Sequence, residues 1–168
     1  TVTPLPSVTT PPTATHMPAA TTPPTAAPTW AGVTEVQIFL IAVGDNGVSG
    51  PLIGCGDSVV GVTRQIPQTR GPLRAAITEL LSIRNQFYGE SGLYNALYLS
   101  NLALADVTID SSGTAIIQLS GTLMLGGECD DPRVEAQIEH TALQFSTVRA
   151  VRVTVNGTPL EDLLGGEG

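Results

Sequence analysis

After residue 30 the apolar and polar positions follow clear periods, and each period predicts an element. Residues 35–43 form a run that becomes apolar on both faces, which is typical of a central strand. Gly44, Asp45, Asn46 and Gly47 indicate a turn, and residues 59–65 a second strand. Pro72 then begins a helix. The apolar stripe of this helix recurs at spacings of three and four residues and comprises Leu73, Ala76, Ile77, Leu80 and Leu81.

The chain continues with two strands, a helix and a last strand. Residues 102–109 and 114–120 are predicted to form a hairpin around a turn at 110–113. Asp131 is expected to cap the second helix, with Pro132 at its first position. Residues 151–155 alternate valine with polar side chains and predict a half-buried strand. The stripe of the second helix comprises Val134, Ile138, Thr141 or Ala142, and Phe145.

The element order ββαββαβ predicts an α+β domain. We expect a single, mostly antiparallel sheet with both helices on one face. Residues 84–101 fit neither period, so we expect an irregular insertion there. It contains the aromatic residues Phe87, Tyr88, Tyr94 and Tyr98.

Residues 1–29 differ in kind from the predicted domain at 30–168. Eighteen of these 29 residues are Thr or Pro, and none is Asp, Glu, Arg or Lys. Such a segment favours polyproline II or extended strand over helix, and at ~3.1 Å per residue it reaches about 90 Å. We expect an extended arm that can cross a neighbouring subunit. Its anchoring apolar residues would be Val2, Leu5, Val8, Met17 and Trp30.

The charge balance narrows the range of partners. The net charge is −8 and all seven cations are arginine, which argues against binding to nucleic acid or to an anionic membrane surface. Charged residues make up only 13% of the chain, against roughly 25% in ordinary soluble proteins. This composition either leaves surface for protein contacts or reflects a lineage that avoids lysine outside the cell. No apolar run approaches the ~20 residues of a membrane span, so we expect no membrane insertion.

Two cysteines, Cys55 and Cys129, stand far apart and without neighbouring histidines. A disulfide is the simplest interpretation, and it implies an oxidising compartment. Two reduced, buried thiols are the alternative. The chain begins with neither Met nor Cys and carries no signal peptide, so we expect a processed, exported protein without a lipid anchor.

Seven segments, in order, resemble the GerMN domain of exported bacterial proteins. They cover nearly all of residues 33–160 and comprise VQIFL (36–40), VTRQIP (62–67), PLRAAITELL (72–81), GLYNAL (92–97), VTIDSSGTAIIQLSG (107–121), IEHTALQF (138–145) and VRAVRVTVNG (148–157). The chain departs from the family pattern after the first helix, where RNQFYGESG replaces Gly-Pro, and at Phe145-Ser146, which replaces Phe-Pro. The resemblance implies an exported domain with no known chemistry, related in fold to ring-building modules of envelope assemblies. It carries over no catalytic residue.

No pattern of catalytic or metal-binding residues stands out. His16 lies in the arm, and His140 is expected to face solvent. Residues 89–92 (GESG) are not a nucleophile elbow, because the second glycine comes one residue early. A disulfide would bring together six oxygen-bearing side chains, which could bind Ca²⁺ but fit acidic turns and a helix cap better. They are Asp45, Asn46, Asp57, Glu128, Asp130 and Asp131. We therefore expect no enzyme, no cofactor and no metal.

Two sites could carry glycans. Asn156-Gly157-Thr158 fits a glycosylation sequon, but Asn-Gly is first a turn former. The ten threonines of the arm are better candidates, for O-linked sugars, although a bare spacer is the alternative.

Two functional hypotheses follow. In the first, the arm docks on the next subunit, and the repeated contact builds a homopolymer, either a ring or a filament. In the second, the arm is a stalk that holds a membrane-tethered binding module, which captures a ligand through the aromatic residues of the insertion. We favour assembly.

Overall fold

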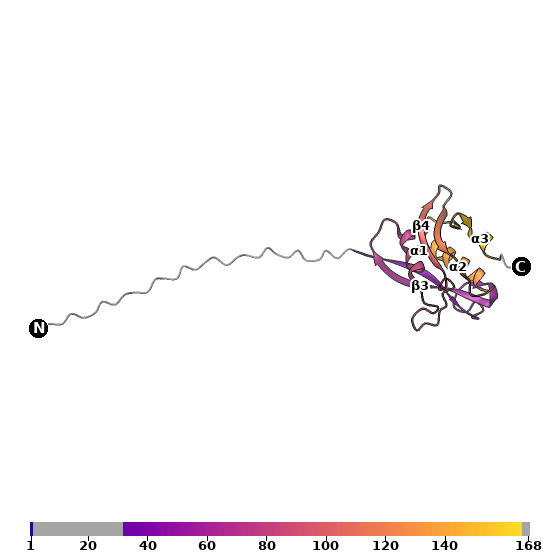
Figure 1. The fold of residues 1–168 in the computed structure, drawn as a ribbon, viewed down its shortest axis with the longest axis horizontal. Coiled ribbons are helices and arrows are strands. Elements are labelled where there is room, and N and C mark those ends of the chain that lie inside the picture. Colours follow the sequence, from indigo (N-terminus) through magenta and orange to yellow (C-terminus); the bar gives the residue numbers. More distant parts are fainter. Residues whose placement is uncertain (2–31, 166–168) are drawn as a thin grey trace. The chain divides into compact units, whose positions relative to one another are not determined.

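The computed structural model of the chain describes Thr1 and residues 32–165 (Figure 1). The predicted arm, with Val2, Leu5, Val8, Met17 and Trp30, lies outside these residues. The domain is α+β, as predicted, but its described part contains two sheets and not one. The first sheet has the order β1-β3-β2 and is antiparallel throughout. Its strands are β1 (Val33–Ala42), β2 (Leu52–Ile53) and β3 (Asp57–Pro67).

The second sheet has the order β4-β5-β6-β7. The predicted hairpin is confirmed as an antiparallel pair, β4 and β5. β6, however, lies parallel to β5, because the intervening helix α2 returns the chain to the end at which β5 began. The strands are β4 (Asn101–Ile109), β5 (Thr114–Thr122), β6 (Ala150–Val155) and β7 (Thr158–Pro159).

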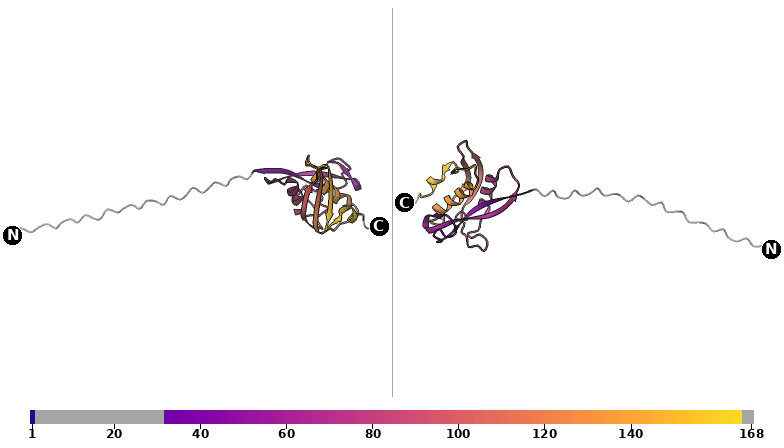
Figure 2. Two further views of the ribbon diagram at one scale, coloured as in Figure 1. Left: turned by 90° about the horizontal axis from the view of Figure 1, so that it is seen from above. Right: turned by 180° about the vertical axis from the view of Figure 1, so that it is seen from behind.

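Helices α1 (Pro72–Ser82) and α2 (Asp130–Leu143) contact each other and strands of both sheets (Figure 2). The predicted stripe of α1 is confirmed, since all five of its members are buried. α2 begins two residues earlier than predicted, at Asp130, with Cys129 at its cap position, so Asp131 is not the capping residue. Two short elements, the 3-10 turn η1 (Gly54–Gly56) and the helix α3 (Leu160–Leu163), complete the fold.

The prediction of one sheet was wrong because both helices bury side chains between the two sheets. α1 contacts β1 of the first sheet and β4 of the second, and α2 contacts β1 and β6. The core between them is mainly aliphatic, and only 4% of the residues of the chain are aromatic. Its largest fully buried side chains include Ile38, Leu40, Ile77, Leu80, Ile117 and Ile138.

The insertion between α1 and β4 is irregular, as predicted, but it is packed into the core. Tyr94 forms an isolated bridge to β1: its N–H donates to Ile41 O at 2.7 Å, and the Ile41 N–H donates to Tyr94 O at 2.9 Å. Tyr94, Asn95, Ala96 and Leu97 are all buried. In the described residues, no helix is long and apolar enough to cross a membrane.

Candidate functional site

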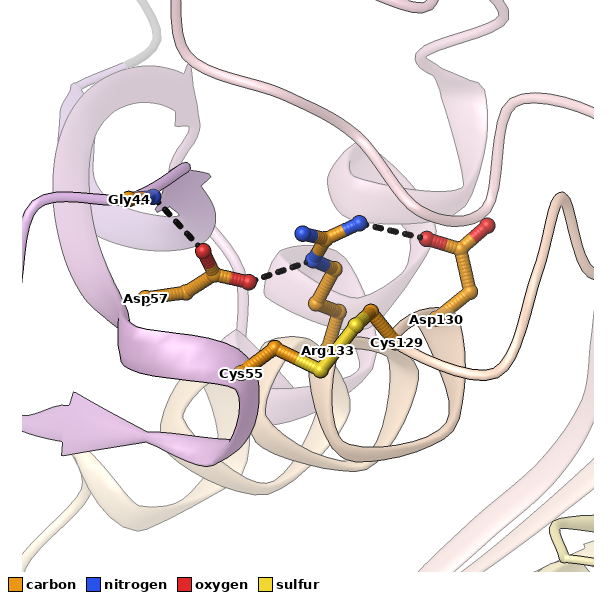
Figure 3. The surroundings of a disulfide bond; sticks show 6 residues. All are labelled: Gly44, Cys55, Asp57, Cys129, Asp130 and Arg133. Atoms are coloured by element: carbon orange, nitrogen blue, oxygen red, sulfur yellow. Dashed lines mark hydrogen bonds and ion pairs between the residues drawn. A yellow bond between two sulfur atoms is a disulfide. The ribbon is translucent and has the colours of Figure 1, made fainter.

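Cys55 and Cys129 form a disulfide that joins η1 to the start of α2 across 74 residues (Figure 3). Cys55 has a φ of 62°, a left-handed conformation that is rare for a residue with a side chain. The bond therefore fixes a tight turn of the first sheet against α2.

Arg133 of α2 lies beside the disulfide, between two buried carboxylates (Figure 3). Its Nε donates to Asp57 Oδ2 at 2.6 Å, and its Nη1 donates to Asp130 Oδ1 at 3.2 Å. The Asp57 and Asp130 side chains are only 1% and 2% exposed. Burial by itself lowers the pKa of Arg133, but the hydrogen bonds to the two carboxylates outweigh it and raise the pKa. Arg133 therefore stays charged and paired with both side chains.

The remaining oxygens of both carboxylates also have donors. Asp57 Oδ1 accepts the Gly44 N–H at 2.7 Å. Asp130 Oδ2 accepts the Gly126 N–H at 2.7 Å and the Tyr94 hydroxyl at 3.0 Å. Burial, followed by this hydrogen bond to Asp130, raises the pKa of Tyr94. One network thus ties β3, α2 and the insertion together.

The six oxygen-bearing side chains considered for Ca²⁺ do not converge. Asp45 binds Ser49 and Ser58, Asn46 bonds to Gly44 O in its own turn, and Asp131 accepts the Gly165 N–H. Only Asp57 and Asp130 lie together, and Arg133 occupies the space between them. In the described part of the chain, no three His, Cys, Asp or Glu residues are placed to hold a metal ion.

The candidate catalytic side chains have structural roles. His140 was predicted to face solvent, but it is half-buried. Its ring packs against the ring of Phe39 in β1, with 5.6 Å between the centroids, because that flank of α2 faces the first sheet. The Ser91 hydroxyl donates to Tyr88 O within a turn. His16 lies outside the described residues. Among the described residues, no serine or cysteine hydrogen-bonds to a histidine.

The aromatic residues of the insertion pack mainly around Tyr94. The rings of Phe87 and Tyr98 each meet the Tyr94 ring edge-on, at 5.9 Å between centroids. The Tyr88 hydroxyl accepts a hydrogen bond from Arg64 at 3.1 Å. Of the four, only Phe87 is largely exposed, at 50%. The Asn156 amide, considered as a glycan site, bonds in both directions to the backbone of Gly121 and holds a turn.

α2 closes the outer edge of β1 with polar side chains, a feature that the sequence analysis missed. Gln144 accepts the Gln37 N–H and donates to Gln37 O, both at 2.7 Å. Thr141 Oγ1 accepts the Phe39 N–H at 3.1 Å, and Gln137 Nε2 donates to Phe39 O at 3.1 Å. We call Gln137, Thr141 and Gln144 the α2 ladder. The sequence contained an indication of this feature, because Gln137, Thr141 and Gln144 are four and three residues apart and so lie on one face of the helix.

The insertion continues this closure toward the end of β1. The bridge between Tyr94 and Ile41 satisfies the next outward-facing backbone groups. The outer edge of β1 is therefore occupied from Gln37 to Ile41, as if by an added strand.

The other long edge strand, β4, is different. The Asp110 N–H donates to Thr114 O across the hairpin, so the alternation of an antiparallel pair points the backbone groups of Thr108 toward β5 and those of Val107 and Ile109 away from it. Within the described residues, no hydrogen bond reaches these outward groups, and β4 pairs only with β5.

A groove of about 470 Å³ runs along this end of β4. Its apolar lining includes Leu73, Val107, Ile109 and Phe145, and its rim includes Arg70 and Arg74. Ile109 is 40% exposed. A free strand edge beside an apolar groove can take up an extended segment through backbone and side-chain contacts.

The comparisons with known proteins agree with this fold. The model of the Germane family, described as sporulation and spore germination, matches residues 49–161. The chain belongs to this family. The predicted GerMN resemblance is thereby confirmed. No curated protein matches the chain.

Two solved structures share the GerMN fold. The first GerMN domain of the sporulation protein GerM from Bacillus subtilis is 19% identical with a TM-score of 0.53, over 76% of this chain and 86% of that one. The tandem GerMN domains of the same protein are 19% identical with a TM-score of 0.54, over 80% of this chain. The chain spans only 43% of that tandem structure. At this identity the likeness shows the fold alone.

The family match places the features of this GerMN domain in two groups. The disulfide, Arg133, the α2 ladder and the β4 edge all lie within the matched residues 49–161. The Thr/Pro arm and β1 precede them. The family match therefore says nothing about the arm, and its role must be argued from this chain.

Proposed function

We propose that this GerMN domain is a non-catalytic module of an exported, sporulation- or germination-related assembly, in which the arm of each copy docks on a neighbour. The contrast between the two strand edges carries the proposal. The β1 edge is filled by the α2 ladder and Tyr94, whereas Val107 and Ile109 leave an outward backbone edge on β4. An uncovered strand edge presents unpaired N–H and C=O groups that can pair with another chain, and proteins usually cover an edge that has no partner.

The proportions of the chain support such a contact. An extended arm of about 90 Å exceeds the diameter of about 35–40 Å expected for a compact domain of 139 residues. The arm can therefore leave one domain and cross the next. An arm-to-domain contact is heterologous, so repetition gives a ring or an open filament.

The polar chemistry of the domain supports a structural task. Its buried charged residues, Asp57 and Asp130, both pair with Arg133 and accept further hydrogen bonds from neutral donors. Its best hydroxyl candidate, Ser91, holds a turn. The buried polar groups thus act on the fold, and we assign no catalytic role to any of them.

The test compares the full chain with a form that lacks residues 1–29. We expect the full chain to form higher-order species as its concentration rises, seen by light scattering and electron microscopy. The truncated domain should be a folded, disulfide-bonded monomer. If the truncated domain forms the same species, or if the full chain stays monomeric, the arm is only a stalk and the assembly proposal is wrong.

A further inference from the structure

We infer that the groove beside β4 is the acceptor for residues 2–8 of a second copy of this chain, which deepens and rests on the proposed function. These residues read VTPLPSV. They would add a short strand to the outer edge of β4, with Leu5 over the groove.

The backbone pattern of the segment fits a one-sided strand. In a strand, Thr3, Leu5 and Ser7 direct their N–H and C=O groups to one side, and Pro4 and Pro6 direct theirs to the other. The prolines, which have no N–H, would then face solvent, where a proline is tolerated on an edge strand. An added strand of this kind pairs with β4 and offers no donors at its proline positions to a further strand.

The side chains fit as well. Leu5 lies on the same face as Thr3 and Ser7, so it can point to the apolar floor formed by Leu73 and Phe145. The segment carries no charged side chain that the groove would have to desolvate. Arg74 at the rim is already paired with Asp106, so an uncharged occupant leaves that ion pair in place.

The stiffness of the arm favours a second copy over the same chain. Eight of residues 1–29 are proline, and such a segment behaves as a semi-rigid spacer. Folding back onto its own β4 would require a reversal within that spacer. Reaching a neighbour requires none.

The experiment uses two full-chain variants, alone and mixed. Leu5→Asp disables the arm, and Ile109→Asp disables the groove. A charge placed in either apolar contact should weaken assembly more than a hundredfold, so each variant alone should be monomeric. An equimolar mixture should form one-to-one dimers and nothing longer, because only one arm and one groove are intact. Val48→Asp is the matched control, since Val48 is exposed and away from the groove, and it should assemble like the native chain.

A second groove variant guards against misfolding. Ile109→Pro removes the outward-facing N–H and part of the apolar side chain without adding a charge, and it should weaken assembly at least roughly fivefold with an unchanged circular dichroism spectrum. A mixture that stays monomeric while the native chain assembles overturns the inference, because the intact arm and the intact groove then do not bind each other. If Leu5→Asp abolishes assembly but both Ile109 variants assemble normally, the acceptor is wrong and the proposed function survives. If Leu5→Asp and the form lacking residues 1–29 both assemble, the proposed function fails too.

Discussion

Replacement of Arg133 by methionine tests whether the charged cluster beside the disulfide holds the domain together. Methionine keeps much of the side-chain length but leaves Asp57 and Asp130 buried without a countercharge. Breaking a buried ion pair from one side typically costs about 3–5 kcal/mol. Both carboxylates keep neutral donors, Asp57 from Gly44 and Asp130 from Gly126 and Tyr94, so we expect one such cost and not two.

The assay is urea unfolding under non-reducing conditions, followed by circular dichroism. Net stabilities of domains lie near 5–15 kcal/mol, so a loss of about 3–5 kcal/mol should shift the midpoint far to lower urea. Arg152→Met, at an exposed position of β6, is the matched control and should change stability by about 0.5 kcal/mol or less. The triple variant that adds Asp57→Asn and Asp130→Asn should recover part of the loss, because it removes the uncompensated charges.

A deficit below about 1 kcal/mol at pH 7, or a triple variant that is no more stable than Arg133→Met, would refute the reasoning.

Three further predictions test the turns and the closed edge. Gln144→Ala should cost roughly 1 kcal/mol through its lost bonds to Gln37 and should also cause association, measured by light scattering on the form without the arm. Gly121→Ala should cost at least about 2 kcal/mol in urea unfolding, because Gly121 has a φ of +114° and a Cβ would collide with the backbone oxygen of Asn101. Hydrogen bonds from Ser112 first, and then from the Thr114 N–H, lower the pKa of Asp110 from its ordinary value of 3.8; an NMR titration should find that lowering, and the stabilisation should be present above pH 3.8 and lost as pH falls through the lowered pKa.

The features that could be predicted from sequence are those set by local periods. The stripe from Leu73 to Leu81 fixes which face of α1 is buried, whatever that face meets. The hairpin turn at Asp110 is equally local, since its own side chain holds the turn. Both were therefore visible without a structure.

The features that were missed depend on partners far along the chain. The fold has two sheets because the outer edge of β1 pairs with side chains of α2 and with the backbone of Tyr94, and not with another strand. These partners lie more than 50 residues away in sequence. Gln137 shows the difficulty most clearly. A glutamine side chain is usually exposed to solvent. Gln137 is nevertheless fully buried, and it hydrogen-bonds to Ala96, Asn95 and Phe39.

The closed β1 edge has a consequence for the symmetry of assembly. Strand-to-strand pairing of β1 between two copies would use the same surface twice, and such an isologous contact closes at a dimer. The α2 ladder blocks this pairing, because it already occupies the outer edge of β1. The proposed contact between the arm and the groove joins two unlike surfaces, so it can repeat from copy to copy without closing at a dimer. The association caused by Gln144→Ala should therefore stop at dimers, whereas the native chain should grow beyond them, and analytical ultracentrifugation separates the two outcomes. Growth of the Gln144→Ala domain without its arm beyond dimers would show that the ladder does not govern symmetry.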